Sequence, residues 1–90
     1  MSRLRVAAAQ IDVVVGDLDG NERRILDAYA RAAEAGCDLV VFPELTVTGY
    51  PPEDLLLRRA FVDAAGAGLA RIAAQSGPTV AVVGFPEPTP

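Results

Sequence analysis

Glu44 is the residue of this sequence whose surroundings best suit a chemical role. It follows an apolar run, residues 39–42, and Pro43, and Leu45 comes directly after it. In parallel α/β sheets, ligands bind beyond the carboxyl ends of the strands, and Glu44 is expected at such an end. A poorly solvated carboxylate holds a proton more readily than one in water, which suits it to act as a general base. On this local pattern alone, the alternative is a glutamate in a surface loop.

Cys37 is not expected to be the nucleophile that such a base would serve. It precedes the strand that Glu44 follows, and the expected strand, residues 38–42, separates the two by roughly 17 Å. We therefore interpret Cys37 as a small packing residue. The sequence contains no histidine and no lysine. A Ser–His–Asp triad, a Cys–His pair, a histidine metal site and a Schiff-base lysine are therefore excluded within these residues.

Three polar residues near the expected start of the first helix have the spacing of a calcium-binding loop. Asp17, Asp19 and Asn21 match its first positions, but Glu22 stands where that loop requires glycine. We therefore predict no metal site. Asp19 and Glu22 instead have the spacing of a capping box, with Asp19 as the residue that caps the helix.

The elements that must position Glu44 alternate between strands and helices. Apolar runs predict three strands that are buried on both faces, over residues 3–11, 38–42 and 79–85. Helical spacing of apolar residues predicts helices over residues 21–35 and 53–76. This order, β-α-β-α-β, predicts an α/β fold with a mostly parallel sheet and right-handed crossovers. Because the edges of such a sheet would be open, we expect an incomplete domain.

Each expected helix carries an apolar stripe. The first stripe consists of Ile25, Leu26, Tyr29, Ala32 and Ala33. The second consists of Leu55, Val62, Leu69 and Ile72. Gly66 and Gly68 have low helix propensity, so a break is expected near them. Arg58 and Arg59 are interpreted as a solvated face of the second helix, or else as a contact with another subunit or domain.

Composition limits the partners that this chain can bind. Of its 90 residues, 51% are hydrophobic, enough for a folded core, and the net charge is −4. An acidic chain offers no basic face to nucleic acid or to an anionic membrane, so we expect neither partner. A single cysteine fits a reducing compartment, and no apolar run reaches the ~20 residues of a membrane span, so a cytoplasmic protein is expected.

Residues 40–50 resemble a known motif. The run Val-Val-Phe-Pro-Glu-Leu at residues 40–45, followed by Thr-Gly-Tyr at residues 48–50, is similar to the first motif of the nitrilase superfamily, the carbon–nitrogen hydrolases. The likeness extends to Val-Ala-Ala-Ala-Gln at residues 6–10 and spans nearly the whole chain. It implies a nitrilase-like αββα sandwich of four layers, of which this chain would be one part.

The resemblance also implies a Glu–Lys–Cys triad. In that family the glutamate acts as general base, the cysteine thiolate attacks the amide carbon, and the lysine helps to stabilise the oxyanion. Glu44 matches the glutamate, whereas the lysine and the nucleophile have no counterpart in this sequence. Residues 1–90 are therefore expected to be the incomplete N-terminal portion of a carbon–nitrogen hydrolase (glutaminase) domain, inactive by itself.

A second stretch narrows the resemblance. Gly-Tyr-Pro-Pro-Glu-Asp-Leu-Leu-Leu-Arg at residues 49–58 is similar to the glutaminase domain of glutamine-dependent NAD synthetases. This implies that glutamine is the substrate and that its ammonia serves a synthetase domain, absent here, which amidates nicotinic acid adenine dinucleotide to NAD. ATP and Mg are expected cofactors of that domain, and none is expected for this segment. The full-length protein is expected to be a homo-oligomer. Tyr50 would lie near the glutamine pocket and bind substrate, or else pack over the neighbouring prolines.

Two alternatives stay open. A stand-alone nitrilase-type amidase, acting on a small amide or carbamoyl compound, would use the same triad without a synthetase domain. A non-catalytic α/β assembly module would leave Glu44 exposed to solvent, and its replacement would then change nothing.

Overall fold

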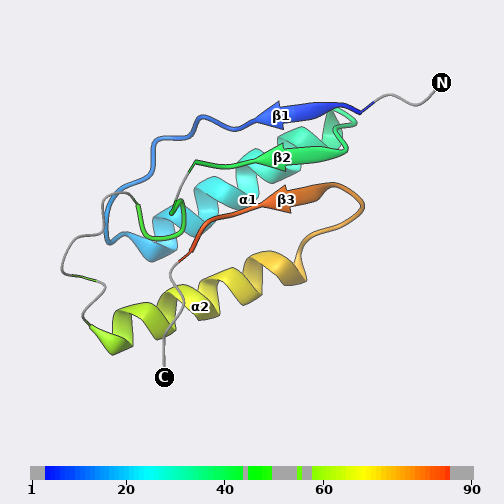
Figure 1. Cartoon of the computed structure of the whole chain (residues 1–90). Coiled ribbons are helices and arrows are strands. Elements are labelled where there is room, and N and C mark those ends of the chain that lie inside the picture. Colours follow the sequence, from blue (N-terminus) through cyan, green and yellow to red (C-terminus); the bar gives the residue numbers. More distant parts are fainter. Residues whose placement is uncertain (1–3, 44, 50–54, 56–57, 86–90) are drawn as a thin grey trace.

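The computed structural model describes residues 4–43, 45–49, 55 and 58–85 and places them in one three-stranded sheet with two helices (Figure 1). In chain order the elements are β1 (Val6–Ala8), α1 (Leu18–Glu34), β2 (Leu39–Val41), α2 (Arg59–Ala74) and β3 (Val80–Val82). The strands lie in the order β1-β2-β3, and both pairs are parallel, with Ala7 beside Val40 and Val40 beside Ala81. The predicted alternation of strands and helices and the predicted parallel sheet are confirmed.

Each paired strand is shorter than the apolar run that predicts it. β1, for example, covers Val6–Ala8 rather than residues 3–11. The chain stays close to its neighbours beyond the paired residues: Ala9 N–H donates to Val41 O at 2.9 Å, and Phe42 N–H donates to Val82 O at 3.0 Å. Apolar runs therefore predict the extended segments, but not how far regular pairing continues along them.

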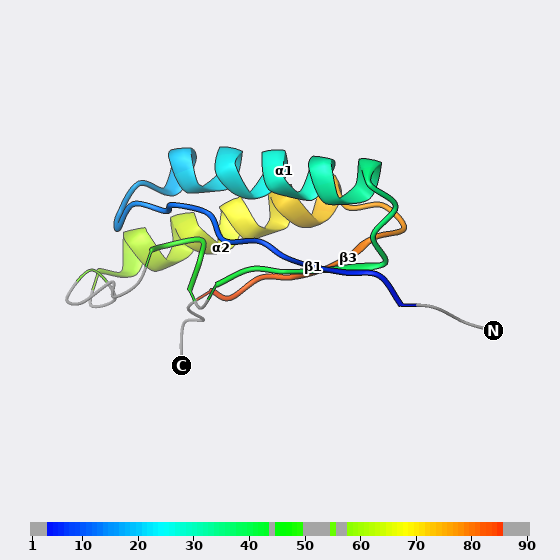
Figure 2. The same cartoon turned by 90° about the horizontal axis from the view of Figure 1, so that it is seen from above.

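Both helices lie on the same face of the sheet (Figure 2). The core between them and the sheet consists of Ile25, Tyr29, Ala32, Val40, Phe42, Val47, Ala65 and Ile72. The other face, called the open face below, carries four valines that are 37–58% exposed, Val6, Val41, Val80 and Val82. The prediction that the strands are buried on both faces is therefore wrong for the described residues. Successive strand residues point to opposite faces, and the helices cover one face.

Helix α1 begins at Leu18 rather than at residue 21 because Asp17, and not Asp19, caps it. The Asp17 side chain accepts a hydrogen bond from Gly20 N–H at 3.1 Å. This bond is the main cause that lowers the pKa of Asp17; desolvation opposes it, and Arg24 adds to the lowering. The predicted cap at Asp19 is wrong, and Asp19 lies instead in the first turn, where a negative charge interacts favourably with the helix dipole.

The buried stripe of α1 matches the prediction in its middle and differs at its ends. Ile25, Tyr29 and Ala32 are buried as predicted, whereas Ala33 is exposed. One turn before Ile25, the stripe continues with Asn21, which is fully buried. A polar residue on the buried face of a helix needs hydrogen-bond partners, and those of Asn21 lie at the candidate site.

Helix α2 runs without a break from Arg59 to Ala74, so the break predicted near Gly66 and Gly68 is wrong. Gly68 is buried against α1, where an added Cβ would lie 3.3 Å from Glu22 Oε1. Glu22 also pairs with Arg71 of α2, at 2.8 Å. Close contact between the two helices thus outweighs the low helix propensity of the glycines.

The start of α2 also differs from the predicted residue 53. Residues 53, 54, 56 and 57 lie outside the described residues, and the helix begins at Arg59. Arg58 is exposed, and Arg59 forms an exposed ion pair with Asp63 of its own helix at 3.1 Å, which favours the interpretation as a solvated face. Within the described ranges, no helix combines the length and apolarity needed to cross a membrane.

Candidate functional site

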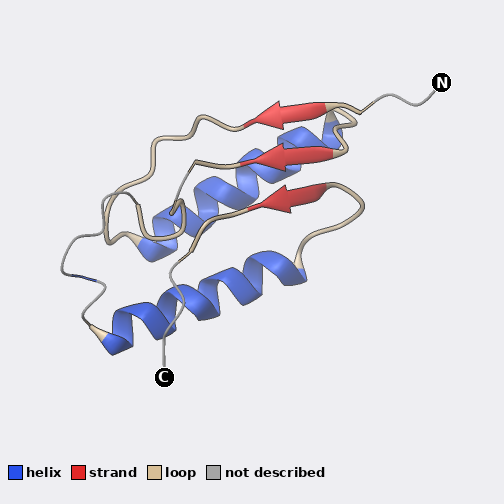
Figure 3. Cartoon of the chain, in the orientation of Figure 1, coloured by secondary structure: helices blue, strands red, loops and turns tan. Residues whose placement is uncertain are grey.

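The loops that follow the three strands gather at one end of the sheet, because all three strands point the same way (Figure 3). Backbone hydrogen bonds join these loops to one another. Gly16 N–H, in the loop after β1, donates to Thr48 O at 2.9 Å, and Val47 N–H donates to Gly84 O, after β3, at 3.5 Å. The segment after β2 is thus fastened on both sides, and this is the end at which Glu44 is expected.

The two predicted site residues, Glu44 and Tyr50, lie outside the described residues. The chain on either side of them is described: Phe42 is buried, and Leu45 begins a turn that runs to Gly49, called the 45–49 turn below. In sequence, this turn joins Glu44 directly to Tyr50. The conformation of the turn therefore determines how the backbone runs between Glu44 and Tyr50.

The 45–49 turn is buried, which is unusual for a connection between elements. Thr46 and Thr48 are both fully buried. Their hydroxyl groups bond to nearby backbone carbonyl groups: Thr46 Oγ1 donates to Pro43 O, and Thr48 Oγ1 contacts Leu45 O at 3.3 Å. Gly49 N–H also donates to Leu45 O, at 2.9 Å. These bonds satisfy polar groups that water does not reach, so the turn has a definite shape.

Two residues of the turn have backbone conformations that side chains disfavour. Leu45, the residue after Glu44, has a φ of 50°, and Gly49 has a φ of 82°. A non-glycine residue in such a region costs on the order of 1–3 kcal/mol, and residues of this kind cluster at functional sites. At Gly49 an added Cβ would lie 2.6 Å from Val15 Cα, so the two loops approach as closely as glycine permits.

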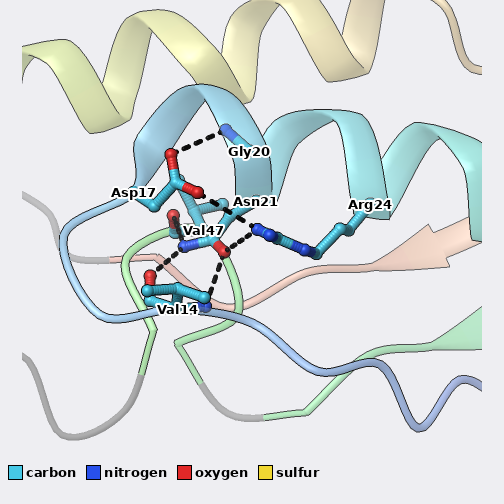
Figure 4. A network of polar contacts seen from close by, with 6 residues as sticks. All are labelled: Val14, Asp17, Gly20, Asn21, Arg24 and Val47. Atoms are coloured by element: carbon cyan, nitrogen blue, oxygen red, sulfur yellow. Dashed lines mark hydrogen bonds and ion pairs between the residues drawn. The ribbon is translucent and has the colours of Figure 1, made fainter.

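Asn21 connects α1 to both of these loops (Figure 4). Its Nδ2 donates to Val14 O at 2.8 Å and to Val47 O at 3.1 Å, while its Oδ1 accepts from Val14 N–H at 2.9 Å and from Arg24 Nη1 at 3.1 Å. A side-chain amide offers two donors and two acceptor positions, and all four are used. Because the partners comprise carbonyl groups on one side and N–H groups on the other, they also fix which way the amide points.

Arg24 and Asp17 support the amide from the helix side. Arg24 Nη1 lies between the two, 3.1 Å from Asn21 Oδ1 and 3.4 Å from Asp17 Oδ2. Asp17 is therefore a helix cap and an ion-pair partner, and Asn21 is a link between loops. The side-chain oxygen atoms of Asp17 and Asn21, two of the three residues that imitate a calcium loop in the sequence, are engaged in these hydrogen bonds. Among the described residues, no cluster of three potential metal ligands occurs.

Cys37 lies at the other end of the sheet, just before β2, as the sequence predicts. It is partly buried and packs against the core. Its carbonyl group accepts a hydrogen bond from Thr79 Oγ1 at 2.8 Å. These contacts support its interpretation as a packing residue.

The residue that sequence reasoning missed is Asn21. The sequence patterns place it at the start of a helix and in an imitation of a calcium loop, although it stands four residues before Ile25 and therefore on the apolar stripe. A polar amide at a position of the apolar stripe is the feature of the sequence that points to a buried hydrogen-bonding role. Its partner Val47, 26 residues away, could not be inferred from a local pattern.

Comparisons with known proteins agree with the motif at residues 40–50. Residues 5–89 match the family model described as carbon–nitrogen hydrolase. The chain is 51% identical over 85 residues to the glutamine-dependent NAD(+) synthetase of Xanthomonas campestris, which covers 93% of this chain and 15% of the relative. It is 50% identical over 62 residues to that of Thermotoga maritima, which covers 69% of this chain and 11% of the relative. The chain thus spans 11–15% of the length of these two relatives.

Solved structures also match this chain, a synthetase more closely than an amidase. A glutamine-dependent NAD(+) synthetase from Cytophaga hutchinsonii superposes with a TM-score of 0.92 at 31% identity, over 98% of this chain and 15% of that one. An amidase from Nesterenkonia superposes with a TM-score of 0.66 at 38% identity, over 78% of this chain and 27% of that one. The likeness therefore extends over more of this chain for the synthetase than for the amidase.

Proposed function

This chain belongs to the carbon–nitrogen hydrolase family, and from that premise we propose that it is the first part of the glutaminase domain of a glutamine-dependent NAD synthetase. The observation that carries the proposal is the match to the Cytophaga synthetase, which covers 98% of the chain at a TM-score of 0.92. The identity of 51% to the Xanthomonas relative supports it. A cytoplasmic location and a homo-oligomeric full-length protein remain predictions.

In the proposed reaction, Glu44 takes the proton from a cysteine thiol that lies outside residues 1–90. The thiolate attacks the amide carbon of glutamine, and a lysine, also outside these residues, stabilises the negative oxygen that forms. The C–N bond then breaks as Glu44 returns the proton to nitrogen, which releases ammonia and leaves a thioester. Water, deprotonated by Glu44, hydrolyses the thioester to glutamate and the free thiol. A Nesterenkonia amidase has been solved with acrylamide added at its active-site cysteine, which supports a cysteine nucleophile.

Ammonia would then serve the amidation of nicotinic acid adenine dinucleotide. The proposal places this step, with its ATP and Mg²⁺, in a synthetase domain outside residues 1–90. Tyr50 is proposed to contact the glutamine, because it follows the 45–49 turn as Glu44 precedes it. A rigid turn that connects the general base, Glu44, to the substrate-binding residue, Tyr50, would keep the distance between them constant during the reaction.

The open face supports the proposal that this chain is one portion of a larger domain. Exposed valines on three neighbouring strands form an apolar surface of a kind that folded proteins usually cover. In an αββα sandwich, a second sheet packs face to face on the first, about 10 Å away. We propose that such a sheet, from another part of the polypeptide, covers Val6, Val41, Val80 and Val82.

The activity is tested on the complete protein that carries this segment. The purified protein is incubated with nicotinic acid adenine dinucleotide, ATP, Mg²⁺ and either glutamine or ammonium, and NAD and glutamate are measured. The proposal predicts NAD from either nitrogen source, and glutamate only from glutamine. The proposal would be contradicted if the protein hydrolyses glutamine but forms no NAD from either glutamine or ammonium.

A stand-alone amidase is the second candidate, because the Nesterenkonia amidase is 38% identical over 78% of this chain. The same assay separates the two functions when small aliphatic amides are included as substrates. Rapid release of ammonia from such amides, without formation of NAD, would favour the amidase.

A further inference from the structure

We infer that Asn21 is a positioning residue of the proposed hydrolase site, which it serves by fixing the 45–49 turn between Glu44 and Tyr50. This inference rests on the proposed function, because Glu44 and Tyr50 are site residues only if that function holds. Asn21 belongs to α1, and its side chain donates at 3.1 Å to Val47 O in the middle of the turn.

Asn21 holds two loops with one side-chain amide group. Nδ2 donates to Val14 in the loop after β1 and to Val47 in the loop after β2. The loops also bond directly, through Gly16 N–H and Thr48 O at 2.9 Å. A shift of the amide would therefore move both loops relative to the helix.

Water cannot replace the Asn21 amide at Val47. Asn21 is 0% exposed, and Val47 is 1% exposed. Without the amide, Val47 O would lose a partner in a place that solvent does not reach. Both backbone groups of Val14, which is 49% exposed, would lose their partner as well. The turn would then have to move to find other partners, since unpaired buried polar groups are costly.

The hydrogen bonds of Asn21 require a side-chain amide of this length. An aspartate at position 21 keeps the shape but has no N–H groups, and its carboxylate would face two carbonyl oxygens. An alanine keeps no hydrogen bond, and a glutamine adds a methylene group to a fully buried site. Substitution therefore changes the position of the turn rather than only the strength of one bond.

A purely structural role is the competing explanation, and Tyr29 provides a matched control. Tyr29 is another polar residue on the buried stripe of α1, and its hydroxyl makes two hydrogen bonds, to Thr79 O and from Gly77 N–H, each 2.7 Å long. These partners precede β3, at the end of the sheet away from the 45–49 turn. Tyr29→Phe thus removes buried hydrogen bonds of α1 without touching the proposed site.

The experiment compares Asn21→Asp and Tyr29→Phe in the complete protein. Melting temperature, kcat and KM for glutamine hydrolysis, and NAD formation from ammonium are measured for each. We expect both variants to melt at lower temperature. Asn21→Asp is expected to lower kcat for glutamine by about 10- to 100-fold, since small misplacements of reacting groups have effects of that size. The ammonium-dependent NAD synthesis of Asn21→Asp is expected to be unchanged. Tyr29→Phe is expected to keep both its glutamine hydrolysis and its ammonium-dependent NAD synthesis.

The outcomes separate the explanations. If Asn21→Asp keeps the wild-type kcat, or loses glutamine and ammonium activity alike, the inference is overturned. If Asn21→Asp fails to fold, Gly49→Ala is tested instead, because it disturbs the same turn from its other side, against Val15. It is expected to lower glutamine-dependent activity and to leave ammonium-dependent activity unchanged. The absence of this difference overturns the inference. A parallel Glu44→Gln protein that still hydrolyses glutamine would instead reject the proposed function.

Discussion

Helix α1 fastens both ends of the sheet with a buried polar side chain, Tyr29 at the amino ends of the strands and Asn21 at the carboxyl ends. At the amino end, the Tyr29 hydroxyl bonds to Gly77 and Thr79, and the Thr79 hydroxyl bonds to Cys37 O. All of these bonds stabilise connections that lead into the strands. The hydrogen bonds at the amino end are thus of the kind that the fold by itself requires.

The carboxyl end contains features that the fold alone does not require. Thr46 and Thr48 are buried in a turn, Leu45 has a positive φ, and Gly49 approaches Val15 within the limit that glycine allows. Such a turn is costly to form, and its shape is held by partners from a helix and two other loops. The difference between the ends agrees with the proposed function, which places the chemistry at the carboxyl end.

Replacing a glycine in the 45–49 turn should destabilise the protein far more than replacing a glycine within a helix. Gly49→Ala forces a side chain into a positive φ, which costs roughly 1–2 kcal/mol, and into contact with Val15, which adds to that loss. Gly66→Ala is the control, because Gly66 lies within α2 and an added Cβ would meet no atom within 4 Å. It should stabilise the helix by about 0.5–1 kcal/mol. Urea denaturation of the complete protein measures both, and equal effects of the two substitutions would show that the backbone at Gly49 is not strained.

The smallest effect is expected where Asp17 caps α1. Its pKa is lowered in the folded chain from an ordinary value of 3.8, chiefly by the Gly20 N–H. The ionised form therefore stabilises the fold above that ordinary value, and this contribution is lost as the pH falls through the lower folded pKa. Asp17→Ser keeps a capping oxygen without a titratable group.

The melting temperatures of the wild type and Asp17→Ser are to be measured between pH 7 and pH 3. The advantage of the wild type should be constant near neutral pH and shrink below pH ~4. A difference that does not change with pH would show that the carboxylate charge does not contribute at this cap.

The order of the elements and the parallel sheet could be predicted from the sequence, because continuous apolar runs and helical spacing are local signals. The faces of the strands could not. The run at residues 39–42 is apolar at every position, so it contains no alternation that would reveal the open face. Whether a second layer covers that face depends on chain outside these residues.

The candidate site was predictable in part. The position of Glu44 after an apolar strand gave the end of the sheet, and the motif at residues 40–50 gave the family that the comparisons confirm. The link from Asn21 to Val47 joins residues 26 apart, and the close approach of Gly49 to Val15 joins residues in two different loops. Such contacts arise from the tertiary fold, so no local pattern contains them.

Glutamine-dependent activity of a Glu44→Gln variant tests the central claim most directly. The complete protein is assayed for NAD formation with glutamine and with ammonium, beside Glu34→Gln, which changes an exposed glutamate at the end of α1. We predict that Glu44→Gln loses glutamine-dependent activity by about 10²- to 10⁴-fold, the usual contribution of a general base, and keeps ammonium-dependent activity. If its turnover of glutamine equals that of Glu34→Gln, the carboxyl end of this sheet does not carry the chemistry.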